Sequence, residues 1–284
     1  MATPSALDLL WSAPARPRRG PKPSLSRERI VTAAIALADA EGLASLSMQH
    51  LAEQLGCAKM ALYRYVPGKA ELVALMIDEA IGEPPAPGSS GTSRAAGTDE
   101  ASGVDEAAES GGADEAAGSG RTDEVTEPNG ASEADWRVVL RAWATTIFGR
   151  YRAHPWSIEA TTGARPNGPH EMAWLERALA ALAGTGLTGA ERLDAVVLLN
   201  GHVRSLVQVA PPGQEDLEGE MARQALVSLS AHADRYPQVM AAFAEGPGPG
   251  GRDNALEFGI DRILDGLAVL IAERAGGASP GGAR

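Results

Sequence analysis

Apolar residues recur every three or four positions in two separate parts of the chain, the spacing of amphipathic helices. In the first part, Gly42, Gly56 and Pro67–Gly68 interrupt the repeat at points where helices end. This pattern predicts helices from about Ser26 to Glu41, 47–55, 58–65 and 69–81. In the second part the spacing predicts helices over 136–154, 169–183, 188–209, 215–234, 237–244 and 255–275. Because both parts have helical spacing, we predict an all-α fold: a helix-turn-helix domain of three helices followed by a larger helical domain.

The segment between these parts has a different composition. Residues 83–135 hold two basic and thirteen acidic residues, a net charge of −11 out of −12 for the whole chain. Residues 82–132 are rich in Gly, Ser, Ala and acid, and too poor in apolar side chains to offset the entropy of ordering, so we interpret them as a disordered linker. The segment is either inert or competes with an anionic partner for basic surface.

Five regions follow from these boundaries. They are a basic disordered arm (1–24), a helical domain (25–81), the acidic linker (82–132), a larger helical domain (133–276) and a disordered tail (277–284). The arm carries Arg16, Arg18, Arg19 and Lys22 among prolines that oppose a helix. Such an arm is either a solubilising tail or a strap that adds contacts to DNA.

Bulk composition narrows the class of protein. Hydrophobic residues make up 44% and aromatic residues 4% of the chain, which favours helices over sheets. The single cysteine excludes an internal disulfide framework. No signal peptide and no run of about 18 apolar residues is present, so we expect a cytoplasmic protein without membrane contact.

The spacing from Ala52 to Gly56 to Leu62 is that of a helix-turn-helix. A small residue lets two helices approach, a glycine permits the tight turn, and a leucine fills the corner. The outward side of 58–65 then carries Lys59, Tyr63 and Arg64, which suit a DNA major groove and its phosphates. The alternative is that the tyrosines belong to a small core and the cations to a solvated surface.

The stretch "GLASLSMQHLAEQLGCAKMALYRYVPGKAELV" resembles the DNA-binding module of TetR-family transcriptional regulators. The resemblance implies phosphate contacts from Ser47 and Lys69, and base reading by Gln49. Many members have arginine where Gln49 stands, and glutamine suits adenine better. The resemblance further implies base-edge contacts at the start of the recognition helix and backbone contacts from its tyrosines, at Lys59, Met60, Ala61, Tyr63 and Tyr65.

Residues 136–274 more weakly resemble the regulatory domain of the tetracycline-repressor branch, through "RAHPW" and "EFGIDRILDGLAVLI". Such domains are helical, dimerise through two long helices and hold a small-molecule pocket. The pattern agrees in part, because the helix over 188–209 carries two stripes: an apolar one through Val196, Leu199, Val203 and Leu206, and one that turns polar at Asn200. Two stripes predict two burials, one of them in a homodimer. A single small module also makes too few contacts for specific DNA binding.

Several large side chains of this half are candidate walls of a pocket for a bulky, partly aromatic effector. The competing interpretation is that the tryptophans are core anchors. The candidates are Trp143, Trp156, Trp174, Asn200, His202, Arg204 and Phe258.

Motifs of other classes are missing from the sequence. The histidines lack metal-ligand spacing, and no nucleotide loop or catalytic triad context occurs, so we expect no metal, no cofactor and no enzyme. The leading hypothesis is a repressor released from a palindromic DNA operator by a small molecule. An architectural DNA-binding protein, or an activator with the same DNA-binding module, remains the alternative.

Overall fold

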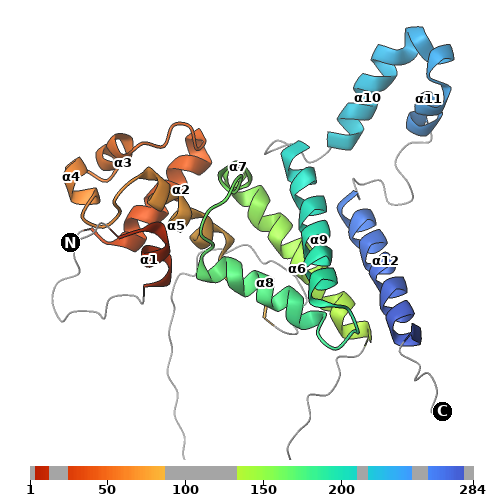
Figure 1. Ribbon diagram of the computed structural model, residues 1–284. Coiled ribbons are helices and arrows are strands. Elements are labelled where there is room, and N and C mark those ends of the chain that lie inside the picture. Colours follow the sequence, from red (N-terminus) through yellow and green to blue (C-terminus); the bar gives the residue numbers. More distant parts are fainter. Residues whose placement is uncertain (1–3, 13–24, 87–132, 210–216, 245–254, 278–284) are drawn as a thin grey trace, which may run out of the picture.

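The computed structural model describes residues 4–12, 25–86, 133–209, 217–244 and 255–277, and these residues are helical without a strand (Figure 1). This confirms the all-α prediction for the described part of the chain. The helices are α1 (Ala6–Trp11), α2 (Arg27–Glu41), α3 (Met48–Gln54), α4 (Lys59–Leu62), α5 (Lys69–Ile81), α6 (Glu133–Ala153), α7 (Trp156–Ala160), α8 (Pro169–Ala181), α9 (Gly189–Val209), α10 (Leu217–Leu229), η1 (Ser230–Arg235), α11 (Pro237–Ala244) and α12 (Ala255–Gly277).

Helices α2 to α5 form the N-terminal domain around one apolar core. Ser26 and Ser47 cap α2 and α3 through their hydroxyls, which accept backbone N–H groups of the first turn. Gly42 ends α2 with φ +81°, a conformation that other residues adopt at a steric penalty. The fully buried side chains of this core include Ile30, Leu37, Leu51, Leu62, Leu72 and Met76.

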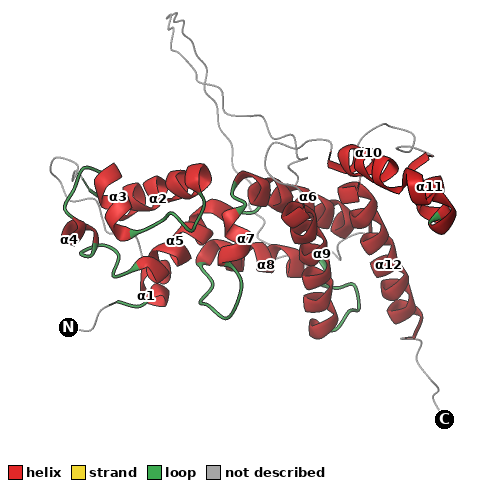
Figure 2. Ribbon diagram, turned by 90° about the horizontal axis from the view of Figure 1, so that it is seen from above, coloured by secondary structure: helices red, strands yellow, loops and turns green. Residues whose placement is uncertain are grey.

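Helices α6 to α12 form the C-terminal domain. Its core collects large side chains from α6, α8, α9 and α12, among them Trp136, Leu140, Trp174, Leu199 and Leu264. Helices α9 and α12 pack against each other at the end of the molecule far from α3 and α4 (Figures 1 and 2). Helices α10 and α11 pack chiefly against each other and η1, beside this pair.

Helix α5 joins the two domains. Leu72 and Met76 lie in the core of the N-terminal domain, whereas the C-terminal half of α5 packs against α6, α7 and α8. Figure 2 shows α7 and α8 beside α5. A displacement of α8 would therefore act directly on α5, which is part of the N-terminal core.

The prediction that residues 1–24 form an irregular arm is wrong for Ala6–Trp11. Ser5 and Asp8 form a capping box that starts α1, and Leu10 is buried where α1 packs on α5. Pro4 precedes the N-cap Ser5 and the other prolines of the arm stand after residue 12, so none of them lies within this helix. The basic residues of the arm and residues 87–132 of the acidic linker lie outside the described residues, as do 278–284.

The helix predicted over 58–65 is shorter than expected. Only Lys59–Leu62 is helical, and Tyr63, Arg64 and Tyr65 follow as turns in which the N–H groups of Tyr65 and Val66 both reach the carbonyl of Leu62. Pro67 keeps the helix from resuming after these turns, because a proline disfavours helical backbone at the residue before it, Val66.

Candidate DNA interface and interdomain site

Helices α3 and α4 meet in the tight turn that the sequence predicts. Gly56 has φ +65°, and the next N–H, that of Cys57, donates to the carbonyl of Ala52 at 3.0 Å. Ala52 is buried against the neighbouring helix, and Leu62 is fully buried between α3 and α4. This corner fixes which side of α4 faces outward.

The outward side of α4 is exposed and cationic. Lys59, Met60, Tyr63 and Arg64 are exposed, and the Lys59 Nζ atom lies 5.9 Å from the centre of the Tyr63 ring. Met60 is 73% exposed, which is far more than a methionine with a core role would be. A positive, protruding helix end with a stacked tyrosine can enter a major groove and contact its phosphates.

The other predicted DNA contacts border this surface. Ser47 is exposed at the start of α3, where its hydroxyl accepts the His50 N–H at 3.1 Å. Lys69 starts α5, and its ammonium donates to the Leu43 carbonyl at 3.4 Å. Ala61 and Tyr65 are half-buried, and the Tyr65 ring packs against the N-terminal core. Tyr65 is thus shared between the core and the surface.

Glu53 is a neighbour of Gln49 that the sequence reasoning did not consider. The Gln49 amide donates through Nε2 to Glu53 Oε1 at 2.7 Å, one turn along α3. This bond uses one proton of the Gln49 amide and orients its side chain. The Gln49 Oε1 atom and the second amide proton can then bond to a base. The spacing of Gln49 and Glu53, four residues apart on a predicted helix, could have indicated this pair from the sequence.

Two aspartates of the N-terminal domain bind the C-terminal domain. Oδ1 of Asp39, in α2, accepts the indole N–H of Trp156 at 2.7 Å and a hydrogen bond from His154 Nδ1 at 2.8 Å. The Trp156 ring is buried in the N-terminal core although it belongs to α7.

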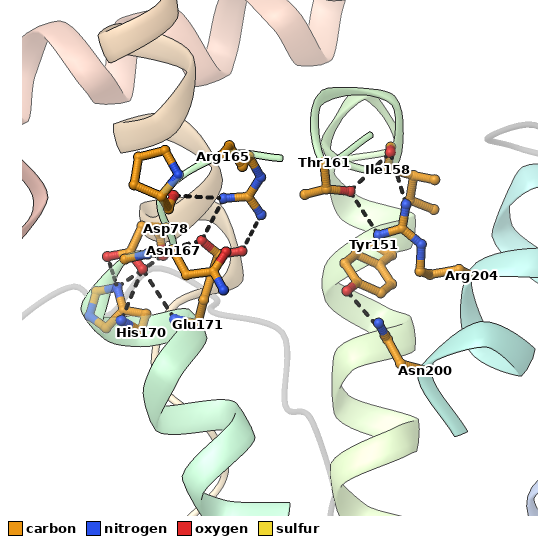
Figure 3. Close-up of polar contacts among 12 residues, drawn as sticks. Asp78, Tyr151, Ile158, Thr161, Arg165, Asn167, His170, Glu171, Asn200 and Arg204 are labelled. Atoms are coloured by element: carbon orange, nitrogen blue, oxygen red, sulfur yellow. Dashed lines mark hydrogen bonds and ion pairs between the residues drawn. The ribbon is translucent and has the colours of Figure 1, made fainter. Parts of the chain in front are cut away.

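The second aspartate, Asp78 of α5, lies at the start of α8 (Figure 3). Its Oδ1 accepts the backbone N–H groups of His170 at 2.9 Å and Glu171 at 3.1 Å. His170 Nδ1 donates to the Asp78 carbonyl at 2.9 Å, since a carbonyl only accepts. Burial raises the pKa of the Asp78 carboxyl, and the hydrogen bonds from the two N–H groups act in the opposite direction.

A small cavity lies next to Asp78, at the junction of α5, α6, α7 and α8. Its volume is about 20 Å³, room for little more than one water molecule. Tyr151 at its wall donates to Asn200 at 3.2 Å, and burial raises the pKa of this tyrosine. The lining residues are Ile77, Ala80, Ile81, Arg150, Tyr151, Ser157, Thr161 and Glu171.

None of the seven candidate effector contacts lines this cavity, and two of them contact residues that do. Asn200 reaches it through Tyr151, and Arg204 through Thr161, whose hydroxyl lies 2.7 Å from the guanidinium (Figure 3). Trp143 and Trp174 instead pack edge to face in the core, 5.6 Å between ring centres. This is the anchoring role that sequence reasoning left open as the alternative.

The remaining candidates lie elsewhere. Trp156 belongs to the N-terminal core, so its ring faces away from the cavity lining. His202 donates to the Leu256 carbonyl at 3.2 Å in the seam between α9 and α12. Phe258 is 59% exposed on α12. Helical periodicity places these residues on helices, but the pairing of helices decides which of them meet.

Residues that the sequence analysis passed over do most of the bonding at the junction. Arg165 pairs with Glu171, and Arg150, Tyr151 and Thr161 line the cavity. One signal was readable: Asp78 stands between Ile77 and Ala80 on an otherwise apolar side of α5, and a buried acid there requires partners.

Two further properties bound the chemistry of the described residues. Their His, Cys, Asp and Glu side chains nowhere gather in threes around a point that could bind a metal ion. Among the described helices, none combines the length and apolarity needed to span a bilayer.

A helix-turn-helix with an exposed cationic second helix, joined to a larger helical domain, defines a DNA-binding transcriptional regulator. Two family models cover most of the chain: "Bacterial regulatory proteins, tetR family" matches residues 30–76, and "Tetracyclin repressor-like, C-terminal domain" matches residues 128–271. The chain belongs to the TetR family of transcriptional regulators.

Individual relatives extend this assignment over the full length. The chain is 33% identical to the HTH-type transcriptional repressor DrrR1 of Streptomyces coeruleorubidus, across 96% of this chain and 88% of the relative. It is 26% identical to an HTH-type transcriptional regulator of Saccharopolyspora erythraea, across 92% and 91%.

Solved structures share the fold. Apo ActR from Streptomyces coelicolor aligns with a TM-score of 0.59 at 22% identity, over 89% of this chain and 99% of ActR. ActR in complex with actinorhodin aligns with a TM-score of 0.58 at 23% identity, over 87% and 98%.

Proposed function

We propose that the protein is a homodimeric repressor that a bulky, partly aromatic small molecule releases from a palindromic operator. The observation that carries the proposal is the exposed cationic side of α4. Helix α4 packs on α3, in the same core that holds α5, and α5 also contacts the C-terminal domain. The name of the relative DrrR1 supports repression over activation. The effector hypothesis draws on ActR, which has the same fold and was solved with actinorhodin.

Dimerisation draws support from α9 and α12. Both helices carry large apolar side chains that the subunit itself leaves exposed: Leu193, Val197, Leu198, Phe258 and Val269. Exposed apolar side chains on two helices that pack against each other suit a partner with the same pair. Two copies would place two α4 helices in successive major grooves, about one helical turn of DNA apart.

Release requires that the effector prefer the conformation that does not bind DNA, because equal affinity for both conformations shifts nothing. The junction cavity is too small for a bulky molecule as it stands. We therefore propose that the effector enlarges it by separating α8 from α5 and α6, with Tyr151, Asn200 and Arg204 as polar contacts.

The test starts with selection of a duplex from a random DNA library by the purified full-length protein, followed by footprinting. A palindromic protected site, a dimeric mass in sedimentation, and release by members of a panel of aromatic small molecules are the expected results. A monomer that still binds the selected site, or binding without sequence preference, would reject the proposal.

A further inference from the structure

Helix α8 begins without a capping side chain of its own. The residue at its N-cap position is Gly168, followed by Pro169 at the first helical position. The N–H groups of the second and third helical residues, His170 and Glu171, still have an acceptor, but that acceptor is Oδ1 of Asp78 in the other domain (Figure 3). These are the two N–H groups that an N-cap side chain ordinarily satisfies.

The reciprocal half of the capping motif is present within α8 itself. Glu171 Oε2 accepts the Gly168 N–H at 3.1 Å, as the side chain at the third helical position does in a capping box. The capping box is therefore split, with its glutamate on α8 and its cap oxygen on α5. Asp78 and His170 are separated by 92 residues in the chain.

Space, and not backbone conformation, accounts for the glycine. Gly168 has φ −85° and ψ 173°, an extended conformation open to any residue. A Cβ atom built on Gly168 would overlap the carboxylate and Cβ of Asp78, which supply its three nearest atoms. The side chain of Asp78 thus occupies the volume that a cap residue at 168 would fill.

The split cap ties the first turn of α8 to a helix of the N-terminal domain. The Trp174 indole N–H donates to the Gly82 carbonyl at 2.8 Å, one turn further along α8, and so fixes the end of α5 as well. At its other end, α5 places Leu72 and Met76 in the core that supports α3 and α4. The first turn of α8 can therefore form fully only while α5 is docked.

We propose that Asp78 is the positioning residue that couples the first turn of α8 to the DNA-binding surface, by capping α8 from the other domain. The proposal rests on the proposed function for its biological meaning, because a change at the cavity beside Glu171 would reach DNA by this route. The cap itself exists independently of any effector.

The experiment compares the wild type with Asp78→Ala, Asp78→Asn and the double variant Asp78→Ala/Gly168→Asp, all as full-length protein. The double variant moves the cap oxygen into α8. Removal of the Asp78 carboxylate frees most of the space for it, and the first turn of α8 has to shift slightly, because the Cβ of residue 78 lies 2.7 Å from a Cβ built at 168. Hydrogen exchange of the amides at 170–174 is measured with and without the duplex that the wild type selects, and thermal unfolding is followed in parallel.

In the wild type, DNA binding is expected to slow exchange in the first turn of α8. Asp78→Ala is expected to lose this response, to exchange faster at His170 and Glu171, and to melt roughly 2–8 °C lower. Asp78→Asn keeps an acceptor oxygen and is expected to keep both the protection and the response. The double variant is expected to regain the protection and melting temperature but not the response to DNA.

Three results would overturn the proposal: a double variant with a full response to DNA, an Asp78→Ala variant with wild-type exchange, or a wild type that binds its duplex with no change at α8. If the double variant does not fold, the comparison of Asp78→Asn with Asp78→Ala is sufficient to test the proposal. Equal loss of protection at His170 and Glu171 in both variants rejects the cap. If no duplex is selected, the proposed function fails, whereas the coupling is still judged by whether Asp78→Ala splits one unfolding transition into two.

Discussion

The indole nitrogen of Trp156 lies 2.7 Å from Oδ1 of Asp39, so a side chain from α7 is bonded into the core of the N-terminal domain. Trp156 is 6% exposed, and the same carboxylate oxygen also accepts from His154. The two domains are therefore joined by hydrogen bonds on the α2 side as well as at α8.

A double-mutant cycle tests this bond. Asp39→Ala leaves the Trp156 N–H without its acceptor and is expected to lower the free energy of unfolding by about 1–3 kcal/mol. Urea denaturation of the two single variants and of Asp39→Ala/Trp156→Phe gives the coupling energy, which is expected to be about 1 kcal/mol. The matched control is Trp11→Phe, whose exposed indole donates to the Asn167 carbonyl and should change stability by less than about 0.5 kcal/mol. Equal effects at Trp11 and Trp156 would contradict the distinction.

The turn between α3 and α4 gives a second prediction. Gly56→Ala places a side chain at φ +65° and is expected to destabilise by about 1–2 kcal/mol, although open space surrounds the position. Gly149→Ala, an exposed glycine inside α6 with equally open surroundings, is the control and is expected to stabilise by up to about 1 kcal/mol. Chemical denaturation of both variants checks the sign, and a neutral Gly56→Ala would refute the requirement for a left-handed residue.

The ion pair of Glu191 with Arg274 joins the start of α9 to the end of α12 and predicts a pH dependence. Arg274, helped by the Thr188 N–H, lowers the pKa of Glu191 from its ordinary 4.5 to about 2. A depressed pKa in the folded protein adds stability above about pH 4.5, and this stability is lost as the pH falls from about 4.5 to 2. Melting temperatures of the wild type and Glu191→Gln should therefore differ at pH 6 and converge near pH 2.

The size of that difference should be small, because the Arg274 side chain is exposed, Glu191 is only half-buried and salt screens the pair. In 1 M salt the difference at pH 6 should shrink. The control is Glu79→Gln, an exposed carboxylate with no ion-pair partner among the described residues. If the melting temperatures of the wild type and Glu191→Gln still differ at pH 2, the effect of the substitution does not come from the charge of Glu191.

The surface of α4 predicts two kinds of change in DNA binding. Lys69→Gln, at a predicted phosphate contact that borders this surface, should weaken binding to all sequences alike and reduce the dependence of the binding constant on salt by about one ion per subunit. Glu53→Gln should instead alter base preference at one position of each half-site, because Glu53 orients the Gln49 amide. Binding of a base-substituted duplex series, measured across a salt series, separates the two. If Glu53→Gln weakened binding to all of these duplexes equally, Glu53 would have no role in base selection.

The helix-turn-helix was readable from the sequence because its determinants are local. Ala52, Gly56 and Leu62 act within one turn and two short helices, so spacing alone fixes their geometry, and the structure places each as expected. The boundaries of α2, α3 and α5 followed in the same way from serine caps, glycine stops and Pro67–Gly68, whereas α4 ends earlier than predicted. The six-residue helix α1 was missed because its stability depends on packing against α5, 60 residues away in the chain.

The junction was beyond reach for the same reason. Hydrophobic spacing placed Trp174 and Arg204 on helices and left Trp156 between two of them. It did not decide that Trp156 enters the N-terminal core, that Trp174 bonds to Gly82 or that Arg204 bonds to Thr161. The sequence by itself determined the helices, the DNA-binding corner and the family. Only the tertiary structure decided that Asp78 caps α8, because that bond depends on how two distant helices dock, and no local periodicity carries this information.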